Sequence, residues 1–450
     1  MVKRGYIIIF IIFSVSKFCF AKDSKKGEDH FLRKLSLQVK TLSGRSNRNL
    51  PTIRIEKVYK LLKSRNINLQ VLRQKMVQAE LESAKAWSYL KPQLLVRGIY
   101  NRNNLEVKLL DYVLTPKDHL ILMGEMRWAF FNPQLIPILQ MGSLVRRRMR
   151  FTMKRVIRDI LFGATRLYYG ILLSSGMVKI SRDNLASAEA HLKMTRNRLE
   201  GGVSLRLELN RAQLDVTTAR QELLQAKNAL EKVRLSLALL LNRANFSYRV
   251  KRPIALKLPS GDLVKWRRMA LRNRFDLKSA RVMVEVAKKA LQKELLSFLP
   301  ILSLNSSLQG QNVKGFSGRN FNWNVSVVAQ INLYNGGLRF LKIKKARAKL
   351  FEAKLKLGQS LRKINNDLAL AAMEYINVKN TIKVARQRHL LAKSNYIFTK
   401  NQYQAGLVTS TKVLDALKMY RAAQIAMLMS ELNVDIAIIK LRRVIGIFNP

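Results

Sequence analysis

The sequence contains very little cysteine and histidine. Of its 450 residues one is cysteine and four are histidine, and none of them forms a CxxC or HExxH motif of a thiol or zinc site. The GxxxxGK[ST] motif of phosphate-binding loops is missing as well. These absences predict that the chain is not an enzyme and that it binds no cofactor and no metal ion.

Acidic residues are also scarce. The chain has 83 Lys and Arg against 28 Asp and Glu, which gives a formal net charge of +55 at pH 7. Such a charge suits a partner such as nucleic acid, anionic lipid or acidic cargo, although a basic proteome would give the same balance. Nine prolines and 20 glycines are too few for a linker-rich or fibrous chain, and 48% apolar residues exclude a disordered one.

Long apolar runs are missing from most of the chain, and the clearest one lies at the N-terminus. Two basic residues precede an apolar stretch at 6–15, and small residues follow at Cys19 and Ala21. This arrangement is typical of a secretory signal peptide, and about 10 apolar residues are too few to span a hydrocarbon core of ~30 Å. We therefore expect a signal peptide over residues 1–21, a polar segment over 22–52, and no transmembrane helix after the signal.

What the sequence does have is an internal duplication. Leu69 and Leu277 precede Pro92 and Pro300 by the same distance, and further matches follow along both halves. Internal repeats of this kind mark a fold built from two similar units. We expect one repeat over residues 53–250 and a second over residues 251–450.

Each half contains two successive helix-like stretches. Residues 135–197 and 338–401 would each be about 95 Å long if they were helical throughout. Both end before a glycine, Gly202 or Gly406, and glycine commonly ends a helix. After each glycine, apolar or small residues recur at alternating spacings of three and four, which is typical of supercoiled helices. The sequence thus predicts two long helical hairpins. The two seams are Leu209, Ala212, Val216, Ala219, Leu223, Ala226, Leu230, Val233, Leu237 and Leu240, and Val413, Ala416, Tyr420, Ala423, Met427, Ser430, Val434, Ala437, Leu441 and Val444.

Four shorter stretches alternate between apolar and polar residues. In the clearest one, Trp323, Val325 and Val327 alternate with Asn324 and Ser326. This period of two, with one apolar and one polar face, indicates a strand between lipid and water. A soluble sheet packed on helices is the alternative. Four strands cannot close a membrane barrel alone and open edges cannot lie in lipid, so several chains would have to share one barrel. The strands are expected over about 92–103, 118–131, 300–311 and 321–334.

With these features the chain resembles the TolC-like outer membrane efflux proteins, also known as outer membrane factors. The resemblance covers about residues 58–446, and its most specific segment is 403–416, YQAGLVTSTKVLDA. It implies a mostly α fold with a membrane β-barrel. In such a fold duplicated long helical hairpins form an α-barrel tunnel, and each chain of a homotrimer contributes four strands to a shared 12-stranded β-barrel.

The same resemblance implies a function. The chain would be an exit duct in the cell outer membrane, in contact with outer membrane lipids and with a long periplasmic helical extension. It would conduct cargo passively in a tripartite efflux pump or a type I secretion system. Its partners would be a periplasmic membrane fusion (adaptor) protein and an inner-membrane pump of the RND or ABC type, without nucleic acid. A periplasmic coiled-coil adaptor and a basic nucleic-acid-binding coiled coil are the alternatives.

The resemblance also indicates residues of a gate. In relatives a tyrosine, an arginine and two aspartates hold and line a constriction at the periplasmic end of the tunnel. Tyr403 matches the tyrosine and Asp415 the second aspartate, whereas Val408 and Lys412 stand at the other two positions. Tyr403, Lys412 and Asp415 are therefore the gate or aperture candidates. Gly406 and its counterpart in the first repeat, Gly202, are the helix-turn glycines. We expect Lys412 to pair with Asp415, three residues further on the same helix face; plain helix-turn chemistry is the alternative.

Two basic clusters follow the second strand of each repeat, over residues 146–158 and 339–349. Near a membrane they could face anionic lipid headgroups. They could also line the tunnel, or form an ordinary solvated helix face. The sequence leaves these three interpretations open.

Overall fold

The structure is a computed structural model that describes residues 51–109, 112–203, 205–246, 248–254, 258, 260–314 and 319–448. The expected signal peptide and nearly all of the expected polar segment at 22–52 lie outside these residues.

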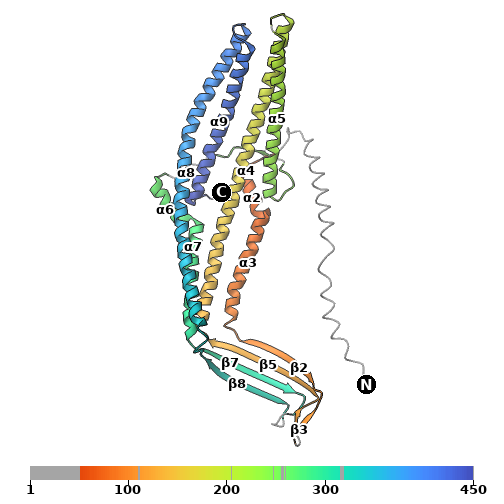
Figure 1. The fold of residues 1–450 in the computed structure, drawn as a ribbon, viewed down its shortest axis with the longest axis vertical. Helices are drawn as coiled ribbons and strands as arrows, with labels where there is room; N and C mark the ends of the chain where they lie inside the picture. Colours follow the sequence, from red (N-terminus) through yellow and green to blue (C-terminus); the bar gives the residue numbers. More distant parts are fainter. Residues whose placement is uncertain are drawn as a thin grey trace, which may run out of the picture.

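Two series of elements follow each other in the same order along the chain (Figure 1). Each series has a short helix, a second helix, two long strands, a very long helix and a return helix, so the predicted duplication of the hairpins is confirmed. The limits of the two repeats stay a prediction. The first series is α2 (Ile55–Arg65), α3 (Ile67–Ser88), β2 (Gln93–Arg102), β5 (Asp118–Phe131), α4 (Leu135–Glu200) and α5 (Arg206–Leu240). The second is α6 (Leu263–Asn273), α7 (Phe275–Leu295), β7 (Ile301–Gln311), β8 (Phe321–Gln330), α8 (Leu338–Gln404) and α9 (Ser410–Ile445).

Two short strand pairs and one 3-10 turn complete the elements of the described residues. A short parallel pair joins β1 (Thr52–Ile53) to β6 (Arg249–Val250), and a small hairpin of β3 (Val107–Leu109) and β4 (Tyr112–Thr115) lies between β2 and β5. The 3-10 turn η2 (Leu296–Phe298) connects α7 to the sheet. The long connection between the first two strands is thus itself a hairpin.

The two long helices give the molecule its length. The helices α4 and α8 have 66 and 67 residues. They run from the sheet to the opposite end of the molecule, where α5 and α9 turn back along them (Figure 1). Every residue of both predicted seams is buried or half-buried. Small residues such as Ala219 and Ala423 are almost fully buried, so the paired helices approach each other closely.

The four long strands form one antiparallel sheet in the order β2-β5-β7-β8. Its two edge strands, β2 and β8, have no neighbour on their outer side among the described residues. The last strand is shorter than the predicted 321–334. It ends at Gln330, which pairs with Ile301, the first residue of β7, so residues after Gln330 have no strand beside them.

The strand register brings the predicted apolar faces of all four strands onto one side. Trp323 and Val327 on this side are each 67% exposed in the single chain. The other side carries polar and charged residues, which agrees with the alternation in the sequence. One row across the apolar side consists of Val96, Gly124, Leu308 and Trp323, and a row across the polar side consists of Leu95, Glu125, Ser307 and Asn324.

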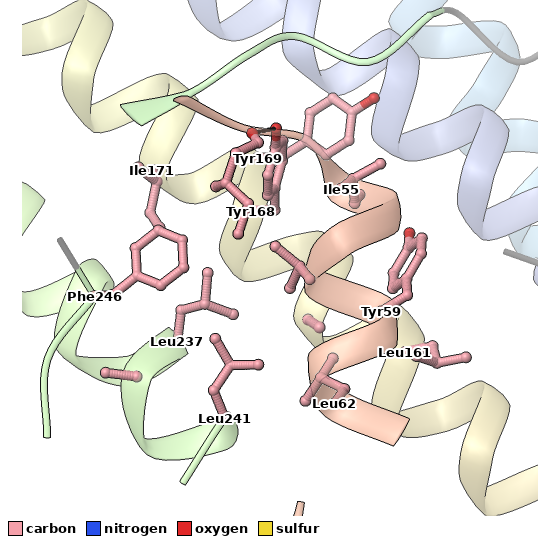
Figure 2. Packing of buried hydrophobic residues seen from close by; sticks show 14 of the residues in the cluster. Ile55, Tyr59, Leu62, Leu161, Tyr168, Tyr169, Ile171, Leu237, Leu241 and Phe246 are labelled. Atoms are coloured by element: carbon pink, nitrogen blue, oxygen red, sulfur yellow. Dashed lines mark hydrogen bonds between the residues drawn. The ribbon is translucent and has the colours of Figure 1, made fainter. Parts of the chain in front are cut away.

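The largest apolar core lies at mid-length, where α2 and the end of α5 pack against α4 (Figure 2). Tyr168 is fully buried in it and donates a hydrogen bond to the carbonyl oxygen of Lys251 (2.7 Å). Tyr59 is hydrogen-bonded to Thr165 (2.6 Å), and burial raises the pKa of Tyr59 to about 12. These bonds satisfy the hydroxyl groups inside the core.

One helix differs from expectation. Among the described residues, α9 is long and apolar enough to cross a membrane by length and composition, although the sequence predicts no such helix after the signal. In the structure α9 packs along α8 and α4. Ala423, Ala437 and Leu441 are buried in these contacts, but only 33% of its most apolar stretch is buried, so packing within one chain accounts for part of its apolar composition.

Candidate functional site

Both hairpins turn at a glycine with the same backbone geometry. Gly202 after α4 has φ +73°, and Gly406 after α8 has φ +79°. In the first turn Val203 N–H donates to the Arg198 carbonyl (2.8 Å) and Gly202 N–H to the Leu199 carbonyl (3.0 Å), and the second turn repeats both bonds at 2.9 and 3.1 Å. This pair of bonds is the Schellman motif, which needs a left-handed residue.

Tyr403 lies at the tip of α8, where its ring is buried against α4. The side chain is 2% exposed. The guanidinium carbon of Arg198 lies 4.7 Å from the centre of the ring, and Arg198 Nη1 donates to the Tyr403 carbonyl oxygen (2.8 Å). The Tyr403 hydroxyl is buried without a hydrogen-bond partner among the described residues. In the single chain the ring and the backbone carbonyl of Tyr403, and not its hydroxyl group, therefore join the two hairpins.

Two further contacts join the hairpins beside Tyr403. Nε2 of His191, on α4, is hydrogen-bonded to Oγ of Ser410 at the start of α9 (2.9 Å). Arg211, on α5, donates to Oγ1 of Thr411 (3.1 Å). Burial lowers the pKa of His191 below its ordinary value, so the imidazole is neutral at pH 7.

A buried ion pair joins the hairpins further from the tip. Arg421 on α9 donates to the Asn184 carbonyl oxygen (3.1 Å) and lies 3.8 Å from the Asp215 carboxylate on α5. Both charged side chains are only about one tenth exposed. Separating such a pair leaves a buried charge without compensation, which typically costs about 3–5 kcal/mol.

The other two gate candidates lie on the exposed face of α9, away from its buried seam. Lys412 and Asp415 are exposed, whereas Val413 and Ala416 are buried in the seam. The expected pairing of Lys412 with Asp415 is not present: no ion pair joins them in the described part of the chain. An exposed pair gains less than about 1 kcal/mol and restricts two long side chains, so the absence has a simple physical reason.

Sequence reasoning missed the α4 side of this site. Asn184, Ala188, His191 and Thr195 are all buried, and Arg198 continues their alternating spacing of four and three. Polar residues on such a seam indicate a specific partner. The sequence does not identify the partner, since Ser410 and Tyr403 lie about 200 positions further along the chain.

This arrangement is suited to holding two helical hairpins together. It links each helix of the first hairpin to the second by a hydrogen bond or an ion pair. The described residues contain no cluster of His, Cys, Asp or Glu that could hold a metal ion.

The two basic clusters lie at different heights on the long helices. The cluster at 339–349 lines a cavity of about 540 Å³ next to the sheet, where the guanidinium carbon of Arg339 lies 4.5 Å from the centre of the Phe298 ring. The cluster at 146–158 runs along α4 away from the sheet and ends with Lys154 and Arg158 over the Phe275 ring.

The sequence matches a known family of proteins over most of its helices. The match is to the outer membrane efflux protein family, over residues 149–243 and 266–447, which together are more than half of the chain. The chain belongs to the outer membrane efflux protein family. This membership agrees with the fold, and it places this efflux protein in the outer membrane with a helical periplasmic extension.

Several solved structures share the fold of this efflux protein. VceC from Vibrio cholerae is 16% identical with a TM-score of 0.76, and the match covers 87% of this chain and 96% of that one. The Campylobacter jejuni CmeC outer membrane channel is 16% identical with a TM-score of 0.77, covering 88% and 86%. The open state of the Neisseria gonorrhoeae MtrE outer membrane channel is 16% identical with a TM-score of 0.72, covering 87% and 89%. No curated protein matches the sequence.

Proposed function

We propose that three copies of this chain form an exit duct that passively conducts cargo through the outer membrane. The observation that carries the proposal is the sheet, which has one continuous exposed apolar side and two free edges, β2 and β8. In lipid these edges would leave backbone N–H and C=O groups without partners. Pairing β8 of one copy with β2 of the next removes both edges, and three copies give 12 strands.

The partners follow from the same proposal. The sequence has no phosphate-binding loop motif of an ATPase, so the energy for transport would come from a separate inner-membrane pump, of the RND or ABC type. A periplasmic adaptor would join that pump to the tips of the hairpins. Tripartite efflux pumps and type I secretion systems both have this organisation. Neither a periplasmic adaptor nor a nucleic-acid-binding protein would need a sheet with an exposed apolar side.

The oligomeric state tests this proposal. The full chain, purified from outer membranes in detergent, is cross-linked and its protein mass is measured by light scattering. We expect three chains per particle. A stable monomer, or recovery from the soluble periplasmic fraction, would contradict the proposal.

We also propose that the contacts at the hairpin tips keep the periplasmic end of the duct closed. The buried hydroxyl of Tyr403, which has no partner within the described chain, would find one in the assembled trimer. Threefold symmetry would arrange the exposed Lys412 and Asp415 as a basic and an acidic ring at the aperture, with charges that nearly cancel.

Conductance in planar bilayers tests the aperture. Lys412→Asp would create two acidic rings, so we expect higher cation selectivity and block by divalent cations, whereas Asp415→Ala should lower cation selectivity. Lys418→Asp is a matched control, because Lys418 is also exposed on α9 but further from the turn. If selectivity and conductance stay unchanged in both Lys412→Asp and Asp415→Ala, these residues do not line the aperture.

A further inference from the structure

A second cavity lies at mid-length of the helices, far from both the sheet and the tips. It has a volume of about 420 Å³, and its walls come from α4, α7, α8 and α9. Here α9 ends against the connection from α6 to α7 (Figure 1). The approach is close, since a Cβ atom added to Gly446 would lie 2.9 Å from Cβ of Asn273.

Basic residues dominate the lining of this cavity, but the acidic ones are already paired. Arg274 pairs with Asp276 (2.6 Å) and Asp367 (3.0 Å), and Arg443 pairs with Asp159 (2.7 Å). These are all the carboxylates that line the cavity. They form ion pairs in its wall and make none with the other cations of the lining.

Three cations of the lining remain without a carboxylate. Arg155 and Arg158 come from α4 and Lys363 comes from α8. None of the three makes an ion pair within the described chain. Like charges gathered at one cavity repel each other, so an anion bound between them would be stabilised.

Arg158 is held in a way that suits anion binding. Its guanidinium carbon lies 4.2 Å from the centre of the Phe275 ring, and Lys154 and Lys278 approach the same ring to 5.6 Å. A guanidinium stacked on a ring uses its face and leaves its N–H edges available for an oxyanion. Arg158 is half-buried, and this burial lowers its pKa.

Membrane lipid does not account for this cluster. Arg158 follows the first residue of α4, Leu135, by 23 positions, which is about 35 Å along a helix. Attraction to headgroup charges falls off within a Debye length of about 10 Å. The ligand therefore has to come from the aqueous phase around the helices.

We propose that this cavity binds a small multivalent oxyanion of the phosphate class, held by Arg155, Arg158 and Lys363. Arginine binds phosphate oxygens through two parallel N–H bonds, and lysine adds a point charge. The anion would link α4 to α8 at the level where α9 ends and α7 begins. The proposal concerns a ligand site on the helices and does not depend on the duct or on its gate.

Calorimetry on the full chain in detergent tests the site, with inorganic phosphate and pyrophosphate as the titrants at constant ionic strength. We expect saturable binding to the unchanged protein. Arg158→Gln and Lys363→Gln should each weaken it about tenfold or more, because each removes a charged hydrogen bond. Arg362→Gln is the matched control, since Arg362 is exposed next to Lys363 but does not line the cavity, and it should bind as before.

Three results would overturn the proposal. One is the absence of saturable binding to the unchanged protein. Another is an equal loss in Arg362→Gln, which would indicate attraction by the overall charge. The third is saturable binding of an acidic octapeptide where pyrophosphate does not bind, which would assign the cavity to an acidic segment of a protein partner. Lys363 is exposed, so Lys363→Gln keeps the test valid if Arg158→Gln fails to fold.

Discussion

The two halves of the chain differ at one equivalent position, the connection between the first two helices of each half, α2 and α3 or α6 and α7. In the first half this position is Asn66, whose Nδ2 donates to the Leu240 carbonyl oxygen (2.7 Å) and whose Oδ1 accepts from Leu69 N–H (3.1 Å). In the second half it is Arg274, which pairs with Asp276 and Asp367. One connection is neutral and buried, and the other is ionic.

The surroundings explain this difference. Asn66 lies next to the large core around Tyr168 and Leu237, and it is 3% exposed. The buried clusters near the second connection are smaller. One consists of Leu368, Ala371, Leu441 and Ile445, and the other of Ala270, Leu277 and Ile364. A duplicated fold can thus keep its geometry while one copy is stabilised by apolar burial and the other by charge pairs. Salt and pH should affect the second connection and leave the first unchanged.

The largest effect is expected where the halves agree, at the apolar side of the sheet. Val325→Arg and Val327→Arg should each lower the stability of the protein in the membrane by about 2–4 kcal/mol if these residues face the middle of a membrane. Val96→Arg in the first half should cost the same, because Val96 lies in the row of Trp323. Assembly is measured as the heat-resistant oligomer on gels.

Matched substitutions on the other side of the same strand serve as controls. Asn324→Arg and Ser326→Arg should assemble, since their side already carries charged residues such as Arg97 and Glu125. Equal damage from both sets would reject the assignment of the faces in both halves.

The next largest effect should separate the two connections. Arg274→Gln leaves two carboxylates without their partner and should lower the free energy of unfolding by about 2–4 kcal/mol. Asn66→Ala leaves one N–H and one C=O without a bond and should lower it by about 1–3 kcal/mol. Urea unfolding in detergent measures both. The exposed Arg272 provides the control Arg272→Gln, within about 0.5 kcal/mol of the unchanged protein.

Acid should distinguish the connections further. Burial raises the pKa of Asp276, but hydrogen bonds and the charge of Arg274 outweigh burial and leave this pKa below its ordinary value. Its contribution to stability is therefore complete above the unfolded pKa of about 3.9 and is lost as the pH falls through the lower folded pKa.

The corresponding experiment compares thermal unfolding between pH 7 and pH 3. The deficit of Asp276→Asn relative to the unchanged protein should be largest at pH 7 and should shrink below about pH 4. The deficit of Asn66→Ala should not depend on pH in this way, because Asn66 does not titrate. A pH-independent deficit for Asp276→Asn would show that the ionic contact contributes no stability.

The smallest effect is expected at the turns, where the halves are again alike. Gly202→Ala and Gly406→Ala would place a Cβ in a left-handed conformation with no atom within 4 Å. Each should therefore cost about 1 kcal/mol of conformational strain alone. Gly358→Ala, inside α8 and equally free of contacts, should stabilise the protein by about 0.5–1 kcal/mol. This explanation would be contradicted if Gly406→Ala and Gly358→Ala changed the free energy of unfolding in the same direction.

Periodicity allowed much of the fold to be predicted. The seams after Gly202 and Gly406 predicted the return helices, because a spacing of three and four keeps one helix face buried along its length. Alternation gave the strand faces, because successive side chains point to opposite sides. The end of β8 could not be predicted, since it depends on the pairing of Gln330 with Ile301.

The candidate site was harder to predict because its contacts are distant in sequence. Tyr403 was identified through a family resemblance, but its contact with Arg198 joins two different hairpins. The pairing of Lys412 with Asp415 followed from their spacing alone. Spacing does not determine whether two exposed side chains meet, because solvation and side-chain entropy compete with their attraction.

The lengths of α4 and α8 have a mechanical consequence. Both helices pass the level of Arg274 without a break and continue to the tips. From Arg158 to the end of α4 is about 63 Å, so a tilt of about 5° there would displace the tip by about 5 Å. Over this length, a small tilt of the helix at mid-length therefore moves the tip by a distance comparable to the radius of a narrow pore.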